Sequence, residues 1–351
     1  MGVLAAIIIC IFAAIVVLEI LSLTVGLNKV VFKAGLDMEL TEPDEELTLS
    51  YRVGNTAFFP LMFVSFSFLF DSAVEVREGA EWMERHRTGS LINESYTFDT
   101  YLMPHSNMRG RIRLSIKQRG HYRIGKVYVE VGDFLGFTTR LTSYDLGLDV
   151  VCTARPCEDE PDITALGGLL GDISVRRFIM EDPSLVLGYR EYTGAEPLKA
   201  ISWPQTAKTG RLMVRKHDFT VDNDVAVLVD IEHTEKEVQE RCLSLLRTAC
   251  DRLEEDRIPY ALHSNGDLFD TEKGSGRLHN FGIQRRIGVS QFVRYRPFSS
   301  VIERGFTRSA GRSGAIVIVP KLDEENERLI RRLSESTGIR VCLLEGRRDE
   351  E

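Results

Sequence analysis

The sequence lacks the features that would point directly to a chemical activity. It has no excess of positive charge: 44 Lys and Arg against 52 Asp and Glu give a net charge of −8, which argues against a nucleic-acid binder. No G-x-S-x-G nucleophile motif occurs, and the Gly-Ser-Gly at 274–276 is not followed by the lysine of a phosphate-binding loop. We therefore expect a non-enzymatic protein that binds no nucleic acid.

Cysteine is sparse and scattered, with six residues in 351. The nearest pair, Cys152 and Cys157, has no His or Cys beside it that could complete a zinc site. This pattern predicts free thiols in a reducing compartment.

Basic residues are absent before Lys29, so the basic start of a cleaved signal peptide is missing. Residues 3–25 are almost entirely apolar, and about 20 such residues suffice to cross a bilayer. We therefore predict a transmembrane anchor at 1–27, with the lipid bilayer as a partner. Glu19 either contacts another helix there or reaches water. Lys29 and Lys33 follow the run, which predicts a single-pass cell-membrane protein with cytoplasmic C-terminal domains.

Residues 28–150 show the alternation of strands. The clearest case is the apolar run at 58–70, in which Phe66, Phe68 and Phe70 recur with period two. Several such runs, separated by Gly and Asn, predict an all-β sandwich-like domain.

A different organisation follows. Residues 151–223 read as a connector, with a flexible LGGLLG at 166–171. Residues 224–351 alternate apolar strands at 225–230, 259–263, 315–319 and 341–344 with helices at 235–255 and 324–336 and a partly helical 292–308. This alternation predicts an α/β domain with a mainly parallel sheet.

Three blocks carry a family resemblance. They are RGHYRIGKVYVEVGDFLGF at 119–137, REYTGAEPLKAISWPQTAKTGRLMVRK at 190–216 and DVAVLVDIEHT at 224–234. The chain resembles the bacterial domain of unknown function 58 family (DUF58), which is MoxR-associated and has a von Willebrand factor A-like domain. The resemblance implies a membrane-anchored interaction protein that acts as an adaptor for a MoxR-type AAA+ ATPase.

The third block replaces the metal-binding Asp-x-Ser-x-Ser of active A domains with Asp230, Glu232 and Thr234. Oxygen ligands at alternate positions after a strand could hold Mg²⁺. Alternatively the site is degenerate, no cofactor binds, and Thr234 and Glu237 form a capping box at the next helix.

The second block lies within residues 188–218, which we call the signature segment. Its chemistry-bearing residues either face a partner, as Arg and Trp often do, or form a partly buried lock between domains, which we favour. They are Arg190, Glu191, Tyr192, Trp203, Lys208 and Arg211.

Two other functions remain open. One is a divalent-cation-dependent protein-binding A domain, which predicts stabilisation by Mg²⁺. The other is a membrane-bound hydrolase or transglutaminase-associated enzyme, which predicts a clustered nucleophile and base.

Overall fold

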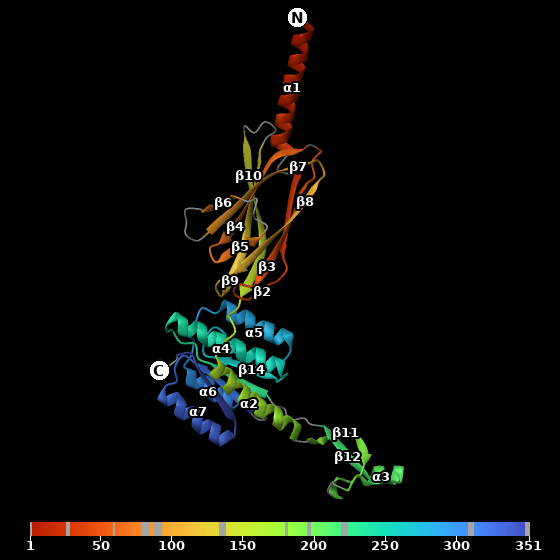
Figure 1. Cartoon of the computed structure of the whole chain (residues 1–351), viewed down its shortest axis with the longest axis vertical. Coiled ribbons are helices and arrows are strands. Elements are labelled where there is room, and N and C mark those ends of the chain that lie inside the picture. Colours follow the sequence, from red (N-terminus) through yellow and green to blue (C-terminus); the bar gives the residue numbers. More distant parts are fainter. Residues whose placement is uncertain are drawn as a thin grey trace. The chain divides into compact units, whose positions relative to one another are not determined.

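The computed structural model of the chain describes residues 2–25, 29–58, 60–78, 84–87, 93–132, 138–179, 182–194, 198–218, 224–307 and 312–347. The chain divides into two compact units, Met1–Ala154 and Arg155–Glu351 (Figure 1). Each unit is described by itself.

The N-terminal segment forms helix α1 (Gly2–Val25). Within the described part of the chain, however, no helix is both long enough and apolar enough to cross a membrane. The predicted transmembrane anchor is therefore wrong, and with it the membrane-anchored fold class and the single-pass cell-membrane localisation.

Two sheets form the rest of the first unit. One is antiparallel, with strand order β1-β3-β8-β5. The other has order β2-β10-β9-β4-β7-β6 and is mixed, because β2 pairs with β10 in parallel while the remaining pairs are antiparallel. The strands are β1 (Val30–Leu36), β2 (Leu40–Thr41), β3 (Glu46–Asn55), β4 (Leu61–Asp71), β5 (Val74–Glu78), β6 (Glu84–Arg87), β7 (Asn93–Leu102), β8 (Asn107–Ile116), β9 (Gly120–Gly132) and β10 (Thr139–Cys152).

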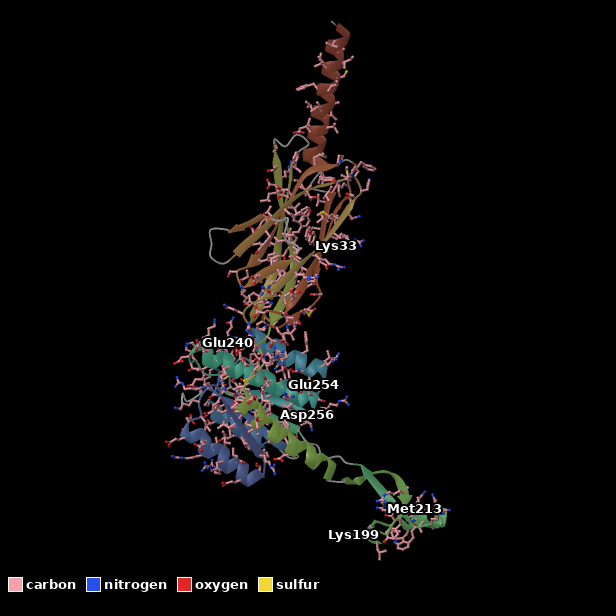
Figure 2. The ribbon with its side chains drawn as sticks, viewed as in Figure 1. Lys33, Lys199, Met213, Glu240, Glu254 and Asp256 are labelled. Atoms are coloured by element: carbon pink, nitrogen blue, oxygen red, sulfur yellow. The ribbon has the colours of Figure 1, made fainter. Side chains whose placement is uncertain are left out.

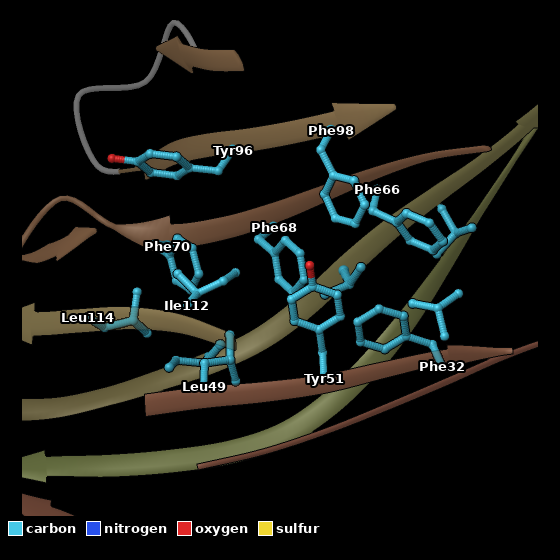
Figure 3. Close-up of a cluster of buried hydrophobic side chains, with 14 of the residues drawn as sticks. Phe32, Leu49, Tyr51, Phe66, Phe68, Phe70, Tyr96, Phe98, Ile112 and Leu114 are labelled. Atoms are coloured by element: carbon cyan, nitrogen blue, oxygen red, sulfur yellow. The ribbon is translucent and has the colours of Figure 1, made fainter. Parts of the chain in front are cut away.

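Aromatic rings fill the core between these two sheets. The period-two phenylalanines of β4, Phe66, Phe68 and Phe70, are all buried, as their alternation predicted. Figure 3 shows them beside Tyr51 of β3, whose ring centroid lies 5.3 Å from that of Phe68. Strands from both sheets therefore contribute to one core, and burying their side chains stabilises the unit.

Helix α2 (Glu160–Ile179) opens the second unit, where the sequence suggested a flexible connector at 166–171. That prediction is wrong, because Leu166, Leu169 and Leu170 are buried. Helix α2 packs closely on strand β15 (Arg312–Val319), since a Cβ on Gly314 would lie 2.8 Å from a methyl group of Ile173. Three glycines lower helix propensity, but packing of an apolar stripe overrides it.

The core of this unit is a four-stranded sheet in which every pair is parallel, with order β14-β13-β15-β16. Strand β13 is buried along its whole length, as expected for a sheet with helices on both faces. The elements lie close to the predicted ranges, with α5 as an addition that the sequence analysis missed. They are β13 (Asp224–Val229), α4 (Lys236–Glu255), β14 (Tyr260–Ser264), α5 (Arg277–Val289), α6 (Phe298–Thr307), β15 (Arg312–Val319), α7 (Glu324–Thr337) and β16 (Arg340–Glu345).

Helices α6 and α7 cover one face of this sheet, where their apolar side chains join those of Ala226 and Leu228 in a mainly aliphatic core. Gly305 of α6 permits this approach, since a Cβ there would lie 2.4 Å from a methyl carbon of Leu228. The signature segment lies between α2 and β13 in the chain. It forms the antiparallel pair β11 (Asp182–Glu191) and β12 (Met213–Asp218) with a short helix, α3 (Trp203–Thr209).

Candidate functional site

The carboxyl edge of the parallel sheet is the first candidate site. From β13 the chain passes to β14 on one side and then to β15 on the other side of β13, so a topological switch point lies between β13 and β15. Ligands of open α/β sheets bind outside the carboxyl ends of the strands at such a point. Asp230 directly follows β13, and its amide donates to the carbonyl of Ile318 on β15 at 2.9 Å. The predicted site residue therefore lies at the switch point.

Asn265, which follows β14, holds this end of the sheet together. Its Nδ2 donates to Oδ1 of Asp230 at 2.5 Å, and its own Oδ1 accepts from the amide of Ile231 at 2.6 Å. Both side chains are buried, Asn265 almost completely. We call this arrangement the Asp230–Asn265 clamp. Sequence reasoning missed Asn265, although its position directly after an apolar strand was a usable signal.

Burial raises the pKa of the Asp230 carboxyl to about 6. The hydrogen bond from Asn265 and the charge of Arg294 act in the opposite direction, whereas the charges of Glu232 and Asp323 raise it further. A buried carboxyl group whose pKa is raised towards neutrality is typical of functional sites, although structural networks produce such shifts as well.

The predicted Mg²⁺ site does not fit these residues. Glu232 is exposed, whereas Asp230 is buried with one oxygen held by Asn265, so the two carboxylates do not form an open set of oxygen donors. The alternative capping box is not formed. Helix α4 has Glu235 at its N-cap with no side-chain capping bond, and Gln239 instead donates to the carbonyl of Glu232 at 3.0 Å.

An ion-pair network supports the loop after β14. Asp270 accepts from Arg296 at 2.5 Å and from Arg304 at 3.0 Å, and it also accepts from the amide of Ser264. Burial acts to raise the pKa of the Asp270 carboxyl, but these hydrogen bonds and the charge of Arg296 outweigh burial, and the pKa is lowered. Asp270 therefore remains ionised and ties this loop to the segment that precedes α6.

Two aromatic rings lie exposed next to the clamp. Phe269 and Tyr295 stack with ring centroids 5.8 Å apart and planes 19° apart, and more than half of each side chain is accessible to solvent. The backbone amide of Tyr295 donates to the carbonyl of Asn265 at 2.8 Å, which holds the backbone of Tyr295 beside the clamp. We call Phe269 and Tyr295 the aromatic pair. Exposed aromatic side chains on a rigid support are typical of protein-binding surfaces.

The signature segment is the second candidate site. Trp203 begins helix α3 with 65% of its surface exposed, and Arg211 pairs with Glu191 at 2.6 Å while both remain exposed. The segment is held by its backbone: the amide of Tyr192 donates to Leu212, and that of Ser202 donates to Met213, which Figure 2 labels.

Of the other predicted residues of the segment, Arg190 and Lys208 are exposed, whereas Tyr192 is half-buried. Ile201 of the same segment is buried. The exposed Arg and Trp side chains suit a partner-facing surface, and both this surface and the interdomain lock stay predictions.

One further cluster was not expected from the sequence. The potential ligand atoms of Cys157, Asp159 and Asp162 all lie within 4.8 Å of one another. Arg241 already occupies the two carboxylates, at 3.1 Å from Asp159 and 2.7 Å from Asp162. Burial raises the pKa of the Cys157 thiol, so the thiolate form that a metal requires is disfavoured. The cluster is best explained as an ion-pair contact between α4 and the start of α2.

Comparison with known proteins adds little. No protein-family model matches the sequence, and no match was found among curated proteins. One structure with a weak likeness is the alkylpurine DNA glycosylase AlkC of Pseudomonas fluorescens, at 14% identity over 34% of this chain and 30% of that chain, with a TM-score of 0.20.

A cohesin module of Clostridium perfringens is similar at 8% identity over 33% of this chain and 96% of that one, with a TM-score of 0.23. A type II cohesin domain of Acetivibrio cellulolyticus is similar at 10% identity over 35% of this chain and 95% of that one, also with a TM-score of 0.23. The chain thus spans less than a third of the length of AlkC, and scores this low support no conclusion about fold or function. The resemblance to the DUF58 family stays a prediction.

Proposed function

We propose that this chain is a non-enzymatic interaction protein whose second unit binds a partner protein at the carboxyl edge of its parallel sheet. The observation that carries the proposal is the aromatic pair, Phe269 and Tyr295, exposed beside the Asp230–Asn265 clamp. The clamp joins the ends of two neighbouring strands, so the aromatic pair stands on a rigid support. Little conformational entropy is then lost when a partner covers it.

The chemistry of this edge suits a protein partner. It offers two aromatic rings, with Arg294 and Glu232 nearby as polar groups of both signs. Contacts of this kind, with an aromatic centre and a polar rim, are characteristic of specific protein interfaces. The resemblance to the DUF58 family suggests that the partner is a MoxR-type AAA+ ATPase, and the signature segment offers Trp203 and Arg211 as a second contact.

The test measures binding of a purified MoxR-type AAA+ ATPase from the same organism to the full chain by biolayer interferometry. We expect a Phe269→Ser/Tyr295→Ser variant to bind at least about tenfold more weakly, because such aromatic residues commonly contribute more than 1 kcal/mol each. The matched control is Phe58→Ser, which removes an even more exposed ring from the first unit.

A Trp203→Ala/Arg211→Ala variant distinguishes the two surfaces. If only this variant loses binding, the signature segment is the contact and the carboxyl edge is not. If the wild-type chain does not bind the ATPase at all, the proposed partner is wrong.

A further inference from the structure

A hollow of about 560 Å³ lies on the antiparallel sheet of the first unit, over strands β1, β3 and β8. Five of the residues that line it have a cationic or small polar side chain on the outer face of the sheet: Lys33, Ser50, Arg52, Arg109 and Arg111. We call this the basic hollow. Side chains alternate between the faces of a strand, so the intervening Ala34, Tyr51 and Gly110 supply the floor. Figure 2 labels Lys33 on this unit.

The strand register concentrates the charge. Lys33 lies directly opposite Arg52, and Arg52 lies directly opposite Arg109. Three cations thus form one row across three strands, at a spacing of about 5 Å per strand. Like charges that face each other across strands destabilise a sheet, so this row has an energetic cost that calls for an explanation.

The next row on the same face provides the space. There Gly35 lies opposite Ser50, and Ser50 lies opposite Arg111. A Cβ added to Gly35 would meet no atom within 4 Å, which shows that the space above this position is open. Gly35 and Ser50, beside the row of cations, thus leave room for a ligand. The volume of the hollow falls within the usual range for small-molecule sites.

These cations differ from other basic residues of the same unit. Arg77 pairs with Glu75 at 3.2 Å, and Arg123 pairs with Asp145 at 3.5 Å. Within the described part of the chain, no ion pair involves Lys33, Arg52, Arg109 or Arg111. Their charges are therefore available to a ligand rather than satisfied by the fold.

We propose that the basic hollow binds a compact polyphosphate anion, a ligand with two or three phosphate groups in a row. Guanidinium groups match phosphate oxygens in a two-pronged geometry, and three of the four cations here are arginines. The net charge of −8 and the small size of the hollow argue against an extended nucleic-acid backbone.

The test titrates the full chain with sodium tripolyphosphate by isothermal titration calorimetry at constant ionic strength, with sulfate and citrate as comparison anions. We expect saturable 1:1 binding of tripolyphosphate that is at least about tenfold tighter than that of either comparison anion. Tripolyphosphate binding no tighter than sulfate would contradict the proposal, because general charge attraction would then suffice. Equal binding of citrate would overturn the assignment to phosphate.

Two variants localise the site. Arg109→Gln/Arg111→Gln removes half of the charge, and Ser50→Leu fills the hollow while leaving every cation in place. Both are expected to weaken binding at least about tenfold. The matched control is Arg123→Gln, which removes one exposed charge elsewhere in the unit and should leave binding unchanged. If Arg123→Gln weakens binding as much as the double variant, or Ser50→Leu leaves it intact, the ligand does not occupy this hollow.

Discussion

The sheets of the two units bury their faces differently. In the first unit each sheet covers the core with one face, so β4 alternates buried phenylalanines with accessible residues. In the second unit helices cover both faces, and β13 is buried throughout. Polar chemistry is therefore found on an outer sheet face in the first unit, as the basic hollow, and at the ends of the sheet strands in the second, as the Asp230–Asn265 clamp.

The largest expected effect tests the one-sided burial of the first unit. Phe68→Ala should destabilise that unit by about 3–5 kcal/mol, because it removes a fully buried ring and leaves a cavity. Phe63→Ala on the same strand is the matched control, since half of that side chain is exposed, and it should cost less than about 1 kcal/mol. Hydrogen exchange of the β4 amides measures the loss of stability in both variants. Similar losses for the two variants would contradict the assignment of the faces.

The next prediction concerns the strand ends of the second unit. The pKa of Asp230 in the folded chain, about 6, lies above its unfolded value. The protonated Asp230 carboxyl therefore stabilises the folded chain fully below pH 4, and this contribution is lost as the pH rises through 6. Asp230→Asn has no such dependence, so its stability relative to the wild-type protein should increase by up to about 3 kcal/mol between pH 4 and pH 7.

Chemical denaturation of both proteins across this pH range provides the measurement. Glu232→Gln is the control, because Glu232 is exposed and only adds to the electrostatic field at Asp230. A stability difference between Asp230→Asn and the wild-type protein that does not change with pH would show that Asp230 is solvated in the folded chain.

Removal of the clamp has a smaller expected effect. Asn265→Ala leaves the buried Asp230 carboxyl and the Ile231 amide without their partner, at a cost of about 1–3 kcal/mol. Thermal unfolding of the second unit should report the loss. Asn280→Ala is a useful comparison, since the hydrogen bond from the Asn280 side-chain amide to Asp251 is only partly buried. An Asn265→Ala variant no less stable than Asn280→Ala would contradict a structural role for the clamp.

The smallest expected effect is at the signature segment. Arg211→Ala should leave the melting temperature unchanged, because Arg211 and Glu191 are both exposed and an exposed ion pair contributes little to stability. Differential scanning calorimetry checks this. A clear fall in the melting temperature would support the interdomain lock that the sequence analysis favoured.

These contrasts also explain which parts of the structure the sequence could predict. The alternation at Phe66, Phe68 and Phe70 and the apolar run before Asp230 are local patterns, and both located real strands. Asn265 was missed because its role depends on strand pairing between residues 35 positions apart. The glycines at 166–171 suggested a connector because local propensity contains no information about the sheet on which α2 packs.

The most direct test of the account is hydrogen-exchange footprinting of the chain with and without the purified MoxR-type AAA+ ATPase. If the carboxyl edge is the binding surface, amides around Phe269 and Tyr295 should become protected in the complex, while strands β1, β3 and β8 remain unchanged. Protection confined to 198–215, or to the first unit, would contradict the central claim that the end of the parallel sheet binds the partner.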